Sequence, residues 1–141
     1  MANYNFVVMG RPKGKGRPRF ARRGNFVTTY TPKETEEYEE KIRLAFREKY
    51  RNAKPLSGNI SIKIMACFGV PKGTSKKKTA ELLDTPYPKK PDADNISKIV
   101  LDSLNTVAFE DDNAVVRLEV TKFYAATEYI AIAISGEENE Q

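Results

Sequence analysis

The chain has 141 residues, of which 40% are hydrophobic and 30% charged, as is typical of one soluble globular domain that can bury a real core. It contains no histidine, which excludes Ser-His-Asp and Cys-His nucleophile systems, histidine-ligated zinc sites, and nucleases of the HNH and His-Cys types. Its net charge is +5, but the charge is unevenly spread, because residues 10–23 contain seven basic side chains and no acidic one.

The first segment, residues 1–9, has neither the basic start nor the cleavage site of a signal peptide. Residues 4–9 are apolar and favour the β conformation, so we expect the first strand there. No apolar run in the chain approaches the roughly 18 residues that a membrane span requires. We therefore expect a cytoplasmic protein without a membrane partner.

Residues 10–23 form a basic loop, in which glycine and proline are interspersed with lysine and arginine. Glycine lets a backbone approach a phosphate closely, and arginine offers bidentate contacts to it. We predict that this loop binds a polyanion, with a solvated, mobile surface loop as the alternative. A short strand is expected over residues 26–29. The candidate contacts in the loop are Arg11, Lys13, Lys15, Arg17, Arg19, Arg22 and Arg23.

The next segment predicts a helix start, with Thr31 as the N-cap and Pro32 at the first helical position. We expect this helix to continue to about Tyr50. The apolar residues that recur at helical spacing, and that we expect it to bury, are Tyr38, Ile42, Ala45 and Phe46.

Residues 60–68 largely alternate apolar and polar side chains, which predicts a strand with one buried face. Cys67, the only cysteine, cannot form an intrachain disulfide, so we expect a packing role and a reducing compartment. A short helix is expected over residues 74–83, and a proline-rich connector over residues 84–91. Lysines 76–78 are typical of a solvated helix face, whereas Lys89 and Lys90 join the candidate polyanion contacts.

The second main helix is expected to begin near Asp94 and to bury the stripe Ile96, Ile99, Val100, Leu104 and Val107. Strands follow over residues 115–120 and 129–135, with residues 125–128 as a hairpin between them and residues 137–141 as a polar tail. The order β-α-β-(α)-α-β-β indicates an α+β fold. We expect a single domain over residues 1–141, with a mixed sheet of about four strands and two main helices packed on it.

The candidate site lies around the start of this second helix, where Asp92 and Asp94 stand two positions apart. In an extended segment such residues point the same way, so the two carboxylates can aim at one point. A third carboxylate there would complete an oxygen cage suited to Mg²⁺, or to Mn²⁺ as a substitute. Three bare carboxylates would repel one another by roughly 4 kcal/mol per pair at ~4 Å, and a divalent cation removes that cost. Such a cation also activates water against a phosphodiester.

Helix capping is the alternative interpretation, because aspartate is a favoured N-cap and negative charge stabilises a helix start. Capping explains one of the two aspartates but not the second. The third carboxylate is expected from the pair Asp111 and Asp112. The extended stretch after the helix is long enough to return to the helix start, which permits convergence within one chain. A contribution across a dimer interface also fits.

The sequence DADNISKIVLD over residues 92–102, followed by FEDD over residues 109–112 and a strand, resembles the signature of RusA-type Holliday-junction resolvases. These proteins are often prophage-encoded endodeoxyribonucleases. KGRPRF over residues 15–20 and YTP over residues 30–32 are similar to the branch found in phages of Gram-positive bacteria. The resemblance covers residues 5 to 135 approximately and implies a homodimer that cuts branched, four-way DNA.

The resemblance implies that Asp92, Asp94 and Asp112 are the essential metal-binding carboxylates, while a shift from Asp112 to Asp111 stays open. It also implies that Lys98 contacts the scissile phosphate or stabilises its developing charge. We therefore expect a Mg²⁺-dependent, structure-selective endodeoxyribonuclease, without an organic cofactor, that resolves Holliday junctions in recombination and repair by paired phosphodiester hydrolysis. The alternatives are a non-catalytic nucleic-acid-binding protein on the same scaffold and a less selective metal nuclease acting on flaps or single strands.

Overall fold

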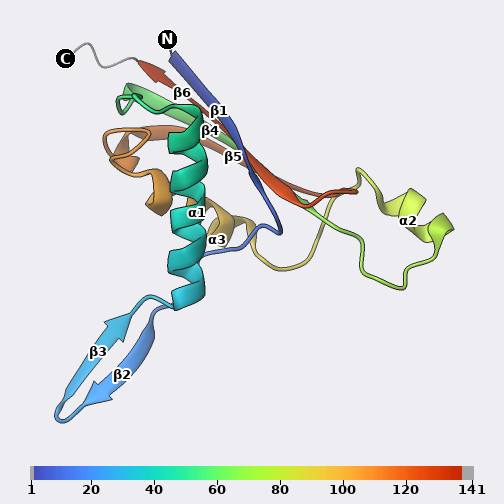
Figure 1. The fold of residues 1–141 in the computed structure, drawn as a ribbon, viewed down its shortest axis with the longest axis horizontal. Coiled ribbons are helices and arrows are strands. Elements are labelled where there is room, and N and C mark those ends of the chain that lie inside the picture. Colours follow the sequence, from blue (N-terminus) through green and yellow to red (C-terminus); the bar gives the residue numbers. More distant parts are fainter. Residues whose placement is uncertain (1, 138–141) are drawn as a thin grey trace.

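Four strands form one mixed sheet in the computed structural model of this chain, which describes residues 2–137 (Figure 1). The strand order across the sheet is β1-β6-β4-β5, and a separate two-stranded sheet contains β2 and β3. Strand β4 pairs antiparallel with β6 and parallel with β5. The elements are β1 (Ala2–Met9), β2 (Arg19–Arg23), β3 (Phe26–Tyr30), α1 (Lys33–Lys49), β4 (Ser57–Phe68), α2 (Lys76–Leu82), α3 (Ala93–Leu104), a short 3-10 helix η1 (Asp112–Ala114), β5 (Val115–Tyr124) and β6 (Tyr129–Glu137).

Helices α1 and α3 lie on the same side of this sheet (Figure 1). The alternating residues Ile60, Ile62 and Ile64 of β4 are fully or almost fully buried in the core. Burial of one such side chain is worth about 1.5–3 kcal/mol, so this layer supplies much of the stability. The predicted α+β class, with a mixed four-stranded sheet and two main helices, is confirmed. The predicted helix stripes are also buried, except that Ala45 is only partly so and that Val107, also partly buried, lies beyond the end of α3 at Leu104.

Strands β5 and β6 do not form the hairpin predicted from residues 125–128, because β4 lies between them. Strand β5 runs parallel to β4 and so requires a long crossover connection. Residues 69–114, which include α2 and α3, form this connection. The link between β5 and β6 then passes the end of β4, where the Ala125 N–H donates to the Phe68 carbonyl at 2.8 Å. This path brings Glu128 next to the basic loop.

The basic loop is shorter than predicted, because residues 19–23 form strand β2 and pair with β3 as an antiparallel hairpin. The turn between the two strands contains Gly24, at φ +62°, and Asn25. A two-residue Gly-Asn turn between two β-favouring runs is a known hairpin signal, and the high charge of this segment obscured it. In Figure 1 the hairpin projects away from the sheet, beyond the start of α1.

Both main helices begin one residue away from the predicted position. Pro32 rather than Thr31 is the N-cap of α1, because its backbone (ψ 142°) is not helical, and its carbonyl accepts the N–H groups of Thr35 and Glu36. Helix α3 begins at Ala93, with Asp92 as its N-cap.

Several smaller predictions can also be compared with the fold. Cys67 is buried, which confirms its packing role. Helix α2 has no buried residue, as expected for a solvated lysine face. Glu137, predicted as the start of the polar tail, is the last residue of β6, and residues 138–141 lie outside the described part of the chain. Within residues 2–137, none of the helices is both long and apolar enough to cross a membrane.

Candidate functional site

The start of α3 presents two exposed carboxylates, Asp92 and Asp94. The Asp92 backbone is extended, its carbonyl accepts the N–H of Ile96, and its side chain makes no capping hydrogen bond to the helix. Asp94 lies in the first turn, where its Oδ2 is 3.9 Å from Nζ of Lys98, one turn further along. The helix therefore does not use the Asp92 carboxylate as a hydrogen-bonding cap, and only its negative charge at the helix start remains as a structural role.

The basic loop and Asp92 meet in one groove, although they are far apart in the sequence. The groove has a volume of about 570 Å³. Its lining residues come from the loop, the connector and the first turn of α3, and they are Arg11, Gly14, Lys15, Arg17, Lys90, Pro91, Asp92 and Asn95. The structure thus places basic side chains beside at least one of the predicted metal-binding carboxylates.

Close backbone packing holds the loop against α3. The Lys15 N–H donates to the Asn95 carbonyl at 2.8 Å. A Cβ atom on Gly14 would stand 2.9 Å from Cβ of Asn95 and 3.0 Å from Cβ of Pro91, which is closer than ordinary van der Waals contact. The position therefore requires glycine. Two residues after Gly14, the Gly16 N–H donates to Oγ1 of Thr35 at 3.2 Å, which ties the loop to α1.

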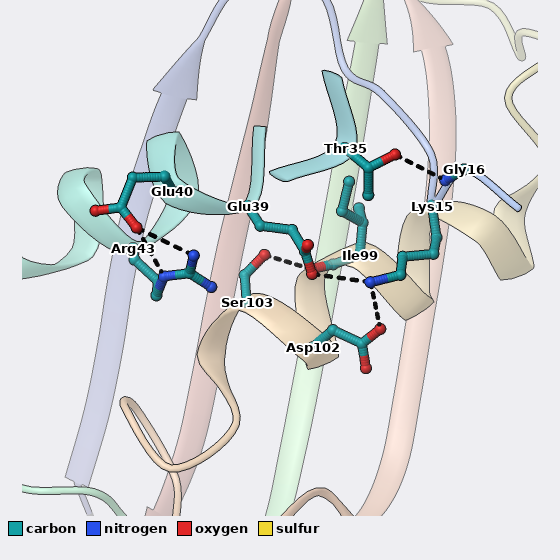
Figure 2. Close-up of polar contacts among 9 residues, drawn as sticks. All are labelled: Lys15, Gly16, Thr35, Glu39, Glu40, Arg43, Ile99, Asp102 and Ser103. Atoms are coloured by element: carbon teal, nitrogen blue, oxygen red, sulfur yellow. Dashed lines mark hydrogen bonds and ion pairs between the residues drawn. The ribbon is translucent and has the colours of Figure 1, made fainter. Parts of the chain in front are cut away.

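Lys15 joins the loop to both main helices (Figure 2). Its Nζ lies 3.1 Å from Oε2 of Glu39 on α1 and 3.1 Å from Oδ2 of Asp102 on α3. Burial alone would lower the pKa of the Lys15 ammonium, but hydrogen bonds and charge attraction from Glu39 and Asp102 outweigh it and raise the pKa. The side chain is therefore a charged link within the fold.

Arg11 is also engaged within the fold. Its guanidinium forms an ion pair with Glu128 at 2.7 Å and donates to the hydroxyl of Tyr87 at 3.0 Å. The DNA contacts predicted for Arg11 and Lys15 thus remain predictions, because each side chain already has partners. The other predicted contacts are exposed and form no ion pair within residues 2–137; they are Lys13, Arg17, Arg19, Arg22, Arg23, Lys89 and Lys90.

Lys122, which sequence reasoning missed, positions the connector that leads to Asp92. Its Nζ donates to the carbonyls of Lys89 at 2.6 Å and Pro91 at 2.8 Å. The predicted strand ended at Val120, whereas β5 continues to Tyr124 and carries Lys122 to this point. No local pattern in the sequence indicates this contact.

Asp112 lies in η1 and its surroundings are acidic. Its N–H donates to Oδ1 of Asn105 at 3.0 Å. A side-chain hydrogen bond with Asp111, slight desolvation, and the charges of Asp111 and Asp102 raise the pKa of Asp112. Asp102 follows Asp94 by two helical turns, a rise of about 12 Å. Asp112 therefore lies towards the far end of α3 from the predicted metal site.

Convergence of Asp92, Asp94 and Asp112 within one chain, one of the two arrangements open from the sequence, is not found. Within residues 2–137, no three acidic or cysteine side chains come close enough together to hold a metal ion. The arrangement in which Asp112 reaches the site from a second copy stays a prediction, as does the choice between Asp111 and Asp112.

Comparisons with known proteins add one family and one relative. Residues 9–135 match the family model described as "Endodeoxyribonuclease RusA". A protein of Bacillus subtilis (strain 168), named "Uncharacterized protein YqaN", is 32% identical over 133 residues, which cover 92% of this chain and 93% of that protein. Both matches span the basic loop, the connector and α3.

Proposed function

The chain belongs to the RusA endodeoxyribonuclease family, and we propose that it is a Mg²⁺-dependent nuclease that resolves Holliday junctions by paired phosphodiester hydrolysis. The observation that carries this proposal is the groove in which Asp92 meets the basic loop. A phosphodiester backbone seated there would have cations on one side and the Asp92 carboxylate, a ligand for a hard metal ion, on the other. This is the pairing of groups that metal-assisted phosphodiester hydrolysis requires.

The donor set at the start of α3 fits Mg²⁺ or Mn²⁺. Asp92 and Asp94 supply hard oxygen ligands, and the Asp92 side chain has no capping role that binding would disturb. Bound there, the ion would lower the pKa of a water molecule and stabilise negative charge on the phosphate. Lys98 lies one turn above Asp94 and has an exposed ammonium, so it is placed to bind the phosphate that is cut.

We propose that Asp112 completes this site from a second copy of the chain. Two observations support a dimer: one chain does not assemble three carboxylates within residues 2–137, and the edge strand that follows Asp112 exposes apolar side chains. Val116 is 66% exposed and Leu118 is 41% exposed. Apolar residues on a sheet edge are a surface on which a second copy can dock. A two-fold dimer would also match the approximate two-fold symmetry of a four-way junction, so that two sites cut opposing strands.

The exposed basic residues of the loop and connector would bind the phosphates. Because each neutralised phosphate releases counterions, log K should fall by ~0.9 per phosphate contact as log salt rises. Phosphate contacts carry no base sequence information. Selectivity for branched DNA would then come from the spacing between the basic surfaces of the two subunits.

Cleavage of synthetic DNA tests this function. A four-way junction, a flap and a linear duplex are each incubated with the protein in Mg²⁺ and in EDTA, and we expect paired cuts in the junction only with Mg²⁺. Asp94→Asn should abolish cleavage and leave junction binding largely intact. Absence of cleavage in both Mg²⁺ and Mn²⁺ would favour a non-catalytic binding protein. Equal cleavage of flaps would favour a less selective nuclease.

A further inference from the structure

The β2–β3 hairpin, which we call the arm, exposes large apolar side chains without any support from the sheet. Its strands pair only with each other among residues 2–137. Phe20 is 72% exposed, Phe26 is 75% exposed and Tyr30 is 49% exposed. An isolated two-stranded hairpin is marginally stable in water, and exposed aromatic groups are unfavourable there. The arm therefore has the properties of a surface that acquires its contacts in a complex.

One face of the arm combines two cations with two aromatic rings. Arg19 lies directly opposite Tyr30, and Arg23 lies directly opposite Phe26. Directly opposed residues in an antiparallel pair have their side chains on the same face. We call this set of four residues the arm face. The opposite face carries one arginine and one aromatic ring, Arg22 and Phe20, with Val27 and Thr29.

We propose that the arm face binds unstacked bases at the branch point of the DNA, with the rings of Phe26 and Tyr30 as stacking platforms and the guanidiniums of Arg19 and Arg23 on the flanking phosphates. This inference rests on the proposed function and adds to it a second recognition element. Interleaved arginines and aromatic rings are the combination that binds single-stranded or unpaired nucleotides. An intact duplex keeps its bases stacked and therefore exposes no base face on which the aromatic rings could stack.

Charge supports DNA rather than protein as the occupant. Residues 1–33 contain no acidic side chain, so the arm and the loop before it form one continuous basic segment. Docking of two arms against each other would bring their arginines together, which costs energy, whereas a phosphate backbone neutralises them.

The reach of the arm also fits a branch point near the cut. Arg17 lines the groove, and β2 begins two residues later at Arg19. A strand of five residues extends about 17 Å. Along DNA this corresponds to about five nucleotides at 3.4 Å each. The arm can therefore contact bases a few nucleotides from a phosphate that is held in the groove.

Tryptophan fluorescence gives a direct test, because the chain contains no tryptophan. Phe26→Trp, in an Asp94→Asn background that binds without cutting, places a single indole on the arm face. We expect a four-way junction to quench its emission by roughly half, because the indole stacks on a base, and a linear duplex of the same length to leave it almost unchanged. Phe20→Trp, on the opposite face, is the matched control and should not respond to either DNA.

Affinity measurements provide the second part of the test. Replacing Phe26 and Tyr30 with alanine should weaken junction binding by about tenfold or more, while duplex affinity changes less than about twofold. Equal loss on both DNAs, or the same loss for Phe20→Ala, would overturn the assignment. A second copy of the chain would instead occupy the arm face if two results were found together. The indole of Phe26→Trp would already be shielded from solvent in the DNA-free protein, and the alanine variant would be monomeric. That outcome would also overturn the assignment.

The cleavage assay separates failure of this inference from failure of the proposed function. If the protein cuts junctions with Mg²⁺ but the fluorescence of the indole at position 26 does not change with DNA, the nuclease function stands and the arm does not bind bases. A protein that neither binds nor cuts junctions contradicts both proposals.

Discussion

Replacement of Lys15 by methionine tests how the loop is held against the two helices. The methionine keeps most of the apolar stem of lysine but removes the charge between Glu39 and Asp102. Glu39 is only 9% exposed, so the change leaves a largely buried carboxylate without its cation. The loop would also lose the link that the Lys15 side chain makes to α1 and α3, although the backbone hydrogen bond from Lys15 to Asn95 remains.

The expected cost follows from the burial of the partners. Removal of one member of a buried ion pair costs about 3–5 kcal/mol. Solvent still reaches this cluster, because the side chains of Lys15 and Asp102 are 24% and 45% exposed, so the attraction is partly screened. We therefore expect a loss of about 2 kcal/mol in the free energy of unfolding, or roughly 6 °C in Tm.

Urea unfolding followed by circular dichroism measures this loss. Arg17→Met is the matched control, because Arg17 lies in the same loop without an ion pair within residues 2–137, and it should change stability by less than about 0.5 kcal/mol. In a Glu39→Gln background, Lys15→Met should cost less than about 1 kcal/mol, since only the half-exposed carboxylate of Asp102 then loses its cation. If Lys15→Met were as harmless as Arg17→Met in the original background, the cluster would not hold the loop.

Three further predictions concern the groove. Gly14→Ala should weaken junction binding and lower Tm, because its Cβ would overlap Asn95 and Pro91; wild-type affinity in a binding titration would contradict this close packing. Lys122→Met should reduce cleavage more than junction binding, because it removes the two hydrogen bonds that hold the connector before Asp92. Equal effects on kcat and on Kd would contradict a positioning role. Asp92→Ala should weaken Mg²⁺ binding in calorimetry while Tm falls by no more than about 3 °C, because the side chain makes no capping hydrogen bond; a larger loss of stability would restore the capping interpretation.

The layers of the fold were predictable because they depend on local periodicity. Ile96, Ile99 and Val100 recur at helical spacing, and they are buried where α3 packs on the sheet. The order of the strands was not predictable in the same way. Residues 125–128 have the composition of a hairpin turn, but the sequence around them does not indicate that β4 lies between β5 and β6 in the sheet.

The candidate site was predictable in its parts but not in its assembly. Asp92 and Asp94 are close in the sequence, and the basic loop is evident from its charge. The loop and the helix start are held together by a backbone hydrogen bond from Lys15 to Asn95, between segments 80 positions apart. Similarly, nothing near Arg11 or Lys15 indicated that Glu128 and Glu39 would engage them. Contacts of this kind arise from tertiary packing, which a single sequence does not display.

Mixing two inactive variants tests the central claim, that Asp112 of one subunit completes the metal site of the other. Asp94→Asn and Asp112→Asn should each be inactive alone. In a mixed dimer, an Asp112 that acts across the interface leaves one site with all three carboxylates. We predict that subunit exchange restores Mg²⁺-dependent nicking of one junction strand. If verified mixed dimers stay inactive while the unmutated protein cuts, the shared site does not exist.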